Sequence, residues 1–209
     1  MPLVSVHLPF DPSPPPGDVR ALLREAERRI EEFQRERIIP SFVPSDFERV
    51  YAVLATLARA AVAPGMLFCE WGSGFGVVTC MAAMLDFDAC GIEIEAELVE
   101  HARQLATDFD VPAEFVCGSF IPAESEECFQ PNQQFTWLTT ETGQSDDLEL
   151  GPADFDVVFA YPWPDEASVV ENLFERHASA GSLLATYHGG DDFRLYRKKN
   201  VRSRRPRRR

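Results

Sequence analysis

The chain has 209 residues, of which 45% are hydrophobic, and a formal net charge of −14 at pH 7. This length and composition suit a globular protein with one sizeable core and exclude a chain too polar to fold. No apolar run approaches the roughly 18 residues that cross a bilayer, and no signal peptide is visible, so we expect a cytoplasmic protein without a membrane part.

The negative charge is unevenly distributed along the chain. Residues 194–209 hold ten of the twenty basic residues and no acidic one, which leaves ten basic against 34 acidic residues in 1–193, a net charge of −24. Such an acidic body repels nucleic acid and favours cationic partners. The Arg-rich stretch 199–209 is typical of a disordered basic tail, which either folds back on the acidic body or contacts a nucleic acid.

The five cysteines lack the paired spacing of metal sites. Four of them fall in segments that we expect to be buried strands or helix. The sequence therefore predicts reduced core thiols, with no metal site and no disulfide; the cysteines are Cys69, Cys80, Cys90, Cys117 and Cys128.

The N-terminal part of the chain predicts an arm followed by two helices. Residues 1–17 are rich in proline and favour an extended arm. Residues 18–64 form a helical extension, with Asp18 and Ser45 as the expected caps of two amphipathic helices.

Strands and helices alternate from residue 65 to 198. We expect strands at 66–71, 89–94, 114–117, 155–160, 183–187 and 193–197, and helices at 75–85, 97–109 and 166–178. This alternation predicts an α/β fold, a Rossmann-like doubly wound and mostly parallel sheet with helices on both faces. Residues 119–153 lack periodicity and are too long for an ordinary connection, so they form either a lid or a disordered insertion.

A glycine-rich turn follows the first of these strands. Gly72, Gly74 and Gly76 stand at alternate positions around Ser73, which indicates a sharply turning backbone that a ligand approaches closely. A dinucleotide-binding loop has the spacing GxGxxG, and here a valine occupies the third glycine position. The preceding acid, Glu70, would repel a pyrophosphate but attract an ammonium group, which disfavours a nicotinamide-dependent oxidoreductase.

A second acid, Glu93, ends the next strand, 17 residues after Gly76, where such sheets hold ribose hydroxyls. The strand, the acid and the GxGxG loop resemble the first motif of class I S-adenosylmethionine-dependent methyltransferases, over about residues 64–188. The resemblance implies S-adenosyl-L-methionine as the cofactor. Glu70 would then face the methionyl ammonium, Gly72–Gly76 would admit the methionyl carboxylate and the ribose, and Glu93 would hold the ribose diol.

The resemblance also implies an adenine site. Ile94 would touch the adenine ring, and Gly118 and Ser119, after the third strand, would lie by its amino edge. The family more often has an acid at this last position, and Ser119 alone is typical of an ordinary turn.

The fourth strand ends at Tyr161-Pro162-Trp163-Pro164, where amino-group methyltransferases of this class carry an Asp/Asn-Pro-Pro-aromatic motif. Tyr161 and Trp163 are the candidate catalytic residues, because Tyr161 can accept a hydrogen bond from an amine and Trp163 can offer its ring face to a cation. The alternative is that the prolines only stiffen a turn. His188, past the fifth strand, is either a general base or a loop residue.

The segment Pro40-Ser41-Phe42-Val43-Pro44 and the helix after it resemble, more briefly, a lysine-methylating branch of the class. This is the branch of histone, mitochondrial carrier and synthase-subunit lysine methyltransferases, in which the segment closes over the methionyl end. The chain is too short to supply the usual antiparallel pair of final strands, and it lacks the membrane anchor of some of these relatives.

The sequence thus predicts a methyltransferase that acts on a nitrogen acceptor, with a lysine of a basic protein as a candidate. Methyl transfer needs little acid–base help once the acceptor and the sulfonium are aligned, so positioning would be the main contribution. Two alternatives stay open: a small-molecule methyltransferase, and a non-catalytic module that binds S-adenosylmethionine or a partner.

Overall fold

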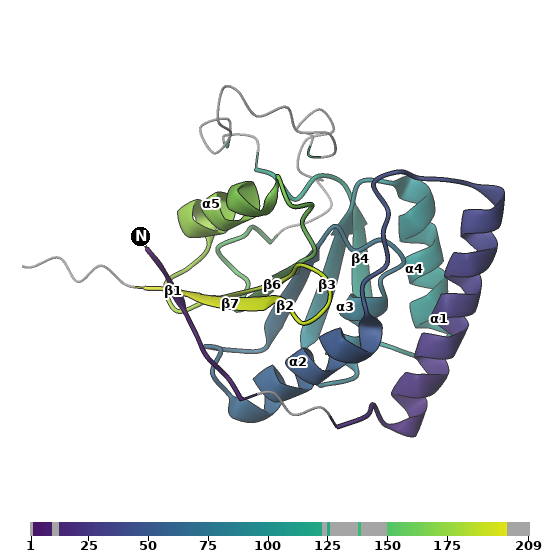
Figure 1. Ribbon diagram of the computed structural model, residues 1–209, viewed down its shortest axis with the longest axis horizontal. Coiled ribbons are helices and arrows are strands. Elements are labelled where there is room, and N and C mark those ends of the chain that lie inside the picture. The colour runs from purple at the N-terminus through teal and green to yellow at the C-terminus, as the bar shows by residue number, and fades with distance from the viewer. Residues whose placement is uncertain (1, 10–12, 123–124, 126–137, 139–149, 200–209) are drawn as a thin grey trace, which may run out of the picture.

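The computed structural model describes residues 2–9, 13–122, 125, 138 and 150–199. In this part of the chain seven strands form one sheet in the order β1-β7-β6-β5-β2-β3-β4 (Figure 1). The strands are β1 (Leu3–Ser5), β2 (Leu67–Trp71), β3 (Asp88–Glu93), β4 (Ala113–Cys117), β5 (Val157–Ala160), β6 (Leu183–Tyr187) and β7 (Phe193–Lys198). Strands β2 to β6 run parallel, and β7 runs antiparallel to β6.

The chain winds outward from β2 in one direction and from β5 in the other. Helices α3 (Val77–Ala83) and α4 (Ala96–Asp108) connect β2, β3 and β4, while α5 (Ala167–His177) connects β5 to β6. The two halves meet where β2 pairs with β5. In a doubly wound sheet this switch point opens a crevice beyond the carboxyl ends of the strands, which is where ligands bind.

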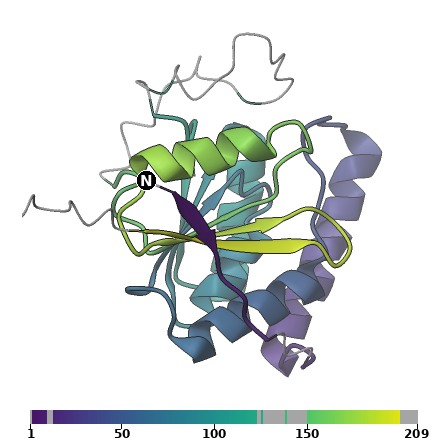
Figure 2. The same cartoon turned by 60° about the vertical axis from the view of Figure 1, so that its left-hand side comes forward.

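Helices cover both faces of the sheet, as the alternating pattern predicts. Helices α1 (Gly17–Glu36), α2 (Phe47–Ala60), α3 and α4 bury their apolar side chains on one face, together with Phe68 of β2. The other face packs against α5, which lies alone above the sheet in Figures 1 and 2, and buries Cys69 and Trp71 of β2. Neighbouring β2 residues therefore belong to opposite layers, as the two-residue period of a strand requires.

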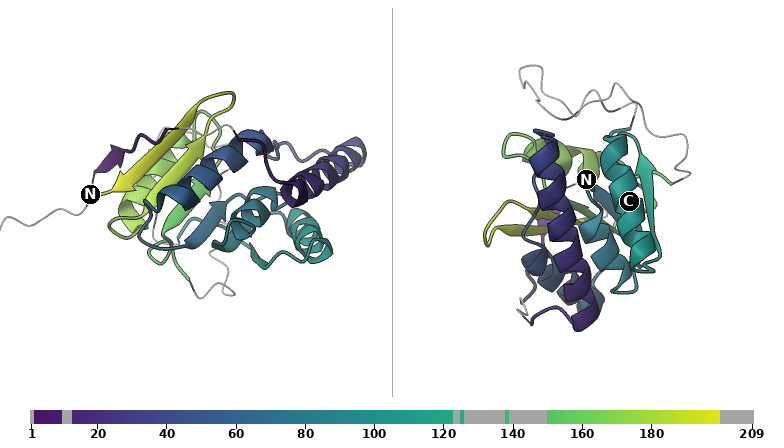
Figure 3. Two further views of the ribbon diagram at one scale, coloured as in Figure 1. Left: turned by 90° about the horizontal axis from the view of Figure 1, so that it is seen from below. Right: turned by 90° about the vertical axis from the view of Figure 1, so that its right-hand side faces the viewer.

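The N-terminal helix α1 is fastened to α4 (Figure 3). Arg29 forms an ion pair with Asp108 at 2.5 Å, and the ring of Phe33 meets that of His101 edge-on with centroids 5.3 Å apart. Because exposed ion pairs contribute little, the buried side of α1 supplies most of this attachment. His101 is thus part of an aromatic cluster in the helical layer.

Strand β1 is a feature that the sequence did not reveal. Residues 1–17 were expected to be an extended arm, but Leu3–Ser5 pairs antiparallel with β7, from Leu3 opposite Lys198 to Ser5 opposite Tyr196. The left view of Figure 3 shows β1 beside β7 at the edge of the sheet. The expectation that the chain is too short for an antiparallel pair of final strands is therefore wrong, because β7 pairs antiparallel with β6 and β1 pairs antiparallel with β7.

The helix starts also differ from those expected. Helix α1 begins at Gly17 with Pro16 as its N-cap, and Asp18 lies in the first turn, where its side chain accepts from the N–H of Val19. Helix α2 is capped by Asp46, one residue after the expected Ser45, through a hydrogen bond from the N–H of Arg49. Aspartate competes well with serine for this position, which explains the shift by one residue.

Several sequence-based expectations concern residues outside the described part. Most of 119–153, all of 200–209 and Cys128 belong to this group. Of the other cysteines, Cys117 is exposed rather than buried, and all four are free thiols. None of the helices in the described ranges is long and apolar enough to cross a membrane.

One buried lysine yields a stability test. Lys198 of β7 is 3% exposed, and its Nζ donates to the carbonyl oxygens of Ala178 and Arg176 at the end of α5. Replacing it with methionine, Lys198→Met, leaves these carbonyls without that donor, so we expect a loss of about 1–3 kcal/mol in the free energy of unfolding, measured with urea. The exposed neighbour gives the control, Lys199→Met; equal losses in the two variants would contradict the buried role.

Candidate functional site

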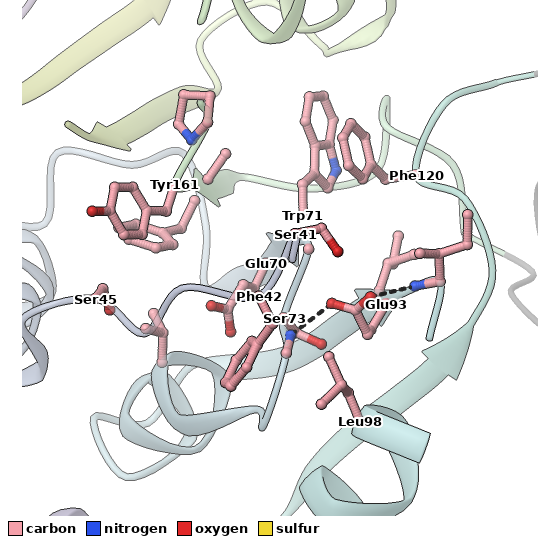
Figure 4. Close-up of a pocket in the computed structure, with 18 of the residues that line it drawn as sticks. Ser41, Phe42, Ser45, Glu70, Trp71, Ser73, Glu93, Leu98, Phe120 and Tyr161 are labelled. Carbon is pink, nitrogen blue, oxygen red and sulfur yellow. Dashed lines mark hydrogen bonds between the residues drawn. The ribbon is translucent and has the colours of Figure 1, made fainter. Parts of the chain in front are cut away.

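A cavity of about 160 Å³ lies at the switch point between β2 and β5 (Figure 4). The segments after β2, β3, β4 and β5 form its floor and walls, and residues 41–45, between α1 and α2, form another wall. Ten of the eleven predicted site residues line it: Glu70, Gly72, Ser73, Gly74, Glu93, Ile94, Gly118, Ser119, Tyr161 and Trp163. The exception is Gly76.

The three loop glycines all have a left-handed backbone, but their surroundings differ. Their φ angles are +75° for Gly72, +52° for Gly74 and +70° for Gly76. A Cβ on Gly76 would lie 2.4 Å from the ring of Phe115 and 2.7 Å from Cβ of Ala102, whereas a Cβ on Gly72 would meet nothing within 4 Å. Gly76 therefore allows the start of α3 to pack closely against β4 and α4, and Gly72 leaves space in the cavity.

Glu70 is a buried carboxylate at the end of β2. Its Oε2 accepts two hydrogen bonds from Thr79 of α3, from the backbone N–H at 2.9 Å and from the hydroxyl at 2.6 Å. Burial raises the pKa of Glu70 to about 8, although the bonds from Thr79 act in the opposite direction. Thr79 was not predicted to contact this acid, and its position in an apolar helix gave no signal.

Glu93, at the end of β3, joins two loops. Its Oε2 accepts the N–H of Gly74 at 2.8 Å, and its Oε1 accepts those of Ile94 at 2.8 Å and Glu95 at 3.0 Å. Burial raises the pKa of Glu93, against the three backbone hydrogen bonds. The hydrogen bond from Gly74 to Glu93, drawn in Figure 4, fixes the glycine loop relative to β3.

The loop after β4 lies beside Glu93. The N–H of Gly118 donates to the carbonyl of Glu93 at 2.8 Å, and the hydroxyl of Ser119 accepts the N–H of Ile121 at 3.1 Å. Ser119 therefore contributes to a local turn as well as to the cavity wall.

Two aromatic residues of this wall were not predicted. The rings of Trp71 and Phe120 stack with centroids 5.0 Å apart and an angle of 6° between their planes. Trp71 lies between the acid and the first glycine of the motif, a position to which the motif assigns no residue type. Phe120 falls in the stretch whose sequence lacks periodicity, so neither position was recognisable.

The segment before α2 closes another side of the cavity. The ring of Phe42 lies against Gly74, where an added Cβ would approach it to 2.6 Å, and it stacks on Phe75 with centroids 5.4 Å apart. Ser41, Val43 and Ser45 also line the cavity. The segment is thus seated on the glycine loop itself.

The turn after β5 supplies the aromatic residues that were predicted to be catalytic. Tyr161 packs on Tyr187 with ring centroids 4.8 Å apart, and in Figure 4 it lies on the opposite side of the cavity from Glu93. Trp163 is 38% exposed at the cavity wall. A buried acid that follows this turn, Glu166, also lines the cavity and was not predicted.

The histidine considered as a general base lies elsewhere. His188 is not among the residues that line the cavity, and its Nε2 contacts the hydroxyl of Thr186 at 2.9 Å. Within the described ranges no three His, Cys, Asp or Glu side chains gather as metal ligands would. The described part of the site can therefore bind, orient and enclose a ligand, with two buried carboxylates as its ionisable groups on the β2 and β3 side.

No protein-family model matches this sequence, and no curated protein matches it. Solved structures share its fold. An RNA methyltransferase from Salinibacter ruber in complex with S-adenosyl-L-homocysteine has a TM-score of 0.51 and 20% identity, over 74% of this chain and 92% of that chain. A methyltransferase from Geobacter sulfurreducens has a TM-score of 0.51 and 18% identity, over 88% and 98%.

A third structure, the methyltransferase PaMTH1 from Podospora anserina with bound S-adenosyl-L-homocysteine, has a TM-score of 0.52 and 11% identity. The comparison covers 83% of this chain but only 63% of that one. The chain therefore has the Rossmann-like fold of class I S-adenosylmethionine-dependent methyltransferases, as its motif predicted. The resemblance to the lysine-methylating branch gains no support from these structures.

The glycines differ in a testable way. For Gly76→Ala we expect a loss of about 3 kcal/mol or more in unfolding free energy, because the left-handed backbone alone costs about 1–2 kcal/mol and the clash with Phe115 adds to it. For Gly72→Ala, whose methyl enters open space, only the backbone cost of about 1–2 kcal/mol applies. Urea unfolding measures the loss in each variant, with Gly17→Ala as a control that lacks strain and clash. Equal losses for Gly72→Ala and Gly76→Ala would contradict the difference between the two glycines.

The raised pKa of Glu70 predicts a pH-dependent stability. The folded protein keeps the Glu70 proton up to about pH 8, but an unfolded chain loses it near 4.5, so the stability that Glu70 contributes is present below pH 4.5 and is lost as the pH rises through 8. Glu70→Gln removes this pH dependence. Between pH 5 and 9 we therefore expect the unfolding free energy of the variant, relative to that of the wild type, to rise by a few kcal/mol, since each pKa unit is worth about 1.4 kcal/mol.

Unfolding in urea at pH 5, 7 and 9 measures this gain. The control is Glu100→Gln, a change of the same kind at an exposed residue of α4. A difference between Glu70→Gln and wild type that stays constant with pH would contradict the assignment.

Proposed function

We propose that this protein binds S-adenosyl-L-methionine and transfers its methyl group to an acceptor. One observation carries the proposal: Glu70, the glycine loop and Glu93 line a single cavity at the switch point of a class I methyltransferase fold. An acid beside the loop suits an amino-acid ammonium and opposes a pyrophosphate, so the pair of carboxylates favours this cofactor over a dinucleotide.

The cavity residues fit such a ligand. Gly72 leaves open space beside the loop, and the hydroxyl of Ser73 is buried in the cavity wall without a hydrogen-bond partner among the described residues. A buried hydroxyl without a partner is costly, so a polar ligand group there would restore the lost hydrogen bond. Glu70 would hold the methionyl ammonium, and Glu93 would hold the ribose diol.

The remaining walls suit the nucleoside. Ile94 and Leu98 line the cavity next to Glu93 and offer apolar surface for a base, and Gly118 and Ser119 would lie by its amino edge. The ring of Phe42 covers Gly74 and would exclude water from the methionyl end. A dry site strengthens the electrostatic interactions made within it.

The chemistry and the positioning are divided between the cofactor and the chain. S-adenosylmethionine supplies, when bound, an electrophilic methyl group on a sulfonium. Tyr161 and Trp163 would orient the acceptor, Tyr161 by accepting a hydrogen bond and Trp163 by offering its ring face. Alignment alone contributes much of the rate of such a transfer, so a general base is not required.

For the acceptor we propose a nitrogen, with a lysine side chain of a basic protein as the first candidate. The charge of −24 over residues 1–193 favours a cationic partner, and the partly exposed indole of Trp163 suits an ammonium group. A small-molecule amine would satisfy the same residues. The acceptor class and the cytoplasmic location remain predictions from sequence.

A second candidate function is a module that binds the cofactor without catalysis. The observation that favours it is the turn Tyr161-Pro162-Trp163-Pro164, which departs from the Asp/Asn-Pro-Pro-aromatic motif at its first, third and fourth residues. Incubating cell extract with radiolabelled S-adenosylmethionine, with and without the protein, separates the two. Label transferred to protein, nucleic acid or small molecules supports the enzyme; binding without transfer supports the module.

Calorimetry tests the cofactor site directly. We expect binding of S-adenosylmethionine and S-adenosylhomocysteine, and a loss of at least about tenfold in affinity for Glu93→Ala, since hydrogen bonds to a charged group are worth about 1.5–3 kcal/mol. Glu100→Ala, at an exposed position of α4, should bind as the wild type does. Absence of binding by the wild-type protein, or an unchanged affinity for Glu93→Ala, would overturn the proposal.

A further inference from the structure

Thr79 is buried within α3 and does not line the cavity, yet it makes both hydrogen bonds that the described residues form with the side chain of Glu70. Its side chain is 0% exposed. The N–H and the hydroxyl both donate to one oxygen, Oε2 of Glu70, at 2.9 and 2.6 Å. The carboxylate of Glu70 is therefore held by hydrogen bonds at one of its two oxygens.

The two hydrogen bonds to Oε2 determine the role of the other carboxylate oxygen, Oε1. The N–H of Thr79 can only donate, so Oε2 has to remain an acceptor, and a proton taken up by Glu70 belongs on Oε1. Oε1 receives no hydrogen bond from the described residues, and Glu70 lines the cavity. The same oxygen would thus carry either the proton of the unliganded site or the contact to a cationic ligand.

The surroundings of Glu70 make its charge costly. Glu93 of β3 is the nearby charge that further disfavours ionisation of Glu70. The thiol of Cys80 on α3 and that of Cys69, the β2 neighbour on the opposite face of the sheet, are close enough for the charge of Glu70 to raise their pKa values. No basic side chain of the described residues forms an ion pair with Glu70 at the distances found elsewhere in the protein. Hydrogen bonds from Thr79 are accordingly the main stabilisation of the ionised form.

We propose that Thr79 is a positioning residue that acts through Glu70, holding Oε2 so that Oε1 alone receives the amino-acid ammonium of the ligand. This rests on the proposed function, because it names how the same site recognises the methionyl end. Binding of the ammonium then displaces a proton from Oε1. Affinity rises with pH as Glu70 ionises, until the ligand ammonium itself loses its proton, with an ordinary pKa of about 7.7–8.0.

The test compares two ligands over pH 6 to 8. S-adenosylmethionine carries the ammonium, and 5′-methylthioadenosine has the same nucleoside without the amino-acid group. For Thr79→Val, which keeps the shape and the N–H but loses the hydroxyl, we expect affinity for S-adenosylmethionine at pH 7 to fall about tenfold, and the rise of affinity with pH to move to higher pH. Affinity for 5′-methylthioadenosine should not change.

Two further variants serve as controls. Thr79→Ser keeps both donors and should restore the wild-type pH profile. Thr56→Val removes another buried hydroxyl, one that donates to the carbonyl of Ala52 within α2 and does not line the cavity, and it should leave both affinities unchanged.

The outcomes separate the two proposals. An equal loss for both ligands in Thr79→Val, or a pH profile identical to that of the wild type, would overturn the positioning role. Failure of the wild type to bind S-adenosylmethionine would count against the proposed function instead. In that case, or if Thr79→Val does not fold, a carbon-13 NMR titration of the Glu70 carboxyl in wild type and Thr79→Ser tests whether Thr79 holds Oε2. The Glu70→Gln variant assigns the signal. A Glu70 carboxyl that titrates as an ordinary exposed one would overturn the positioning role.

Discussion

Two carboxylates buried at the ends of adjacent strands are the constraint around which this site is built. Glu70 and Glu93 are 5% and 8% exposed, and their hydrogen-bond donors are backbone N–H groups and one hydroxyl rather than cations. Ionising a buried carboxyl group without a counter-ion is expensive, so burial raises the pKa of both acids, and the hydrogen bonds that they accept offset part of this cost. The left-handed glycines are what allow the backbone after β2 to turn its N–H groups toward these acids.

This arrangement ties the helical layer to the site. Glu70 reaches α3 through Thr79, and Glu93 reaches the glycine loop through Gly74. Gly76, the N-cap of α3, has no side chain with which to cap the helix, and Glu70 from the preceding strand bonds one of the free N–H groups instead. A change at either acid would therefore disturb the start of α3 as well as the cavity.

The sequence was sufficient for the parts of the molecule that repeat a pattern. Alternation of apolar strands and helices predicted the parallel sheet, and the expected strand 183–187 agrees with β6 at both ends. The motif also drew attention to Glu70 and Glu93, because it has an acid before its glycines and another at the end of the next strand.

Contacts between distant segments left no such pattern. Strand β1 has three residues, too few for a visible two-residue period, and its partner is near the other end of the chain. Thr79 stands in an apolar helix like any small residue, and its importance comes from the strand that happens to lie opposite. Trp71 and Phe120 stack only when the fold brings β2 and the loop after β4 together.

The pairing of β1 with β7 has a consequence for how the chain is made. Leu3 lies opposite Lys198, so among the described strands of this sheet the first to be synthesised pairs with the last. Contacts between such remote segments form late and slowly, because a long loop has to close before they gain anything. During synthesis the parallel core around β2 can assemble first, while β1 has to wait for β7. Until then β6 is an edge strand of the sheet, and an unpaired edge favours association with other chains.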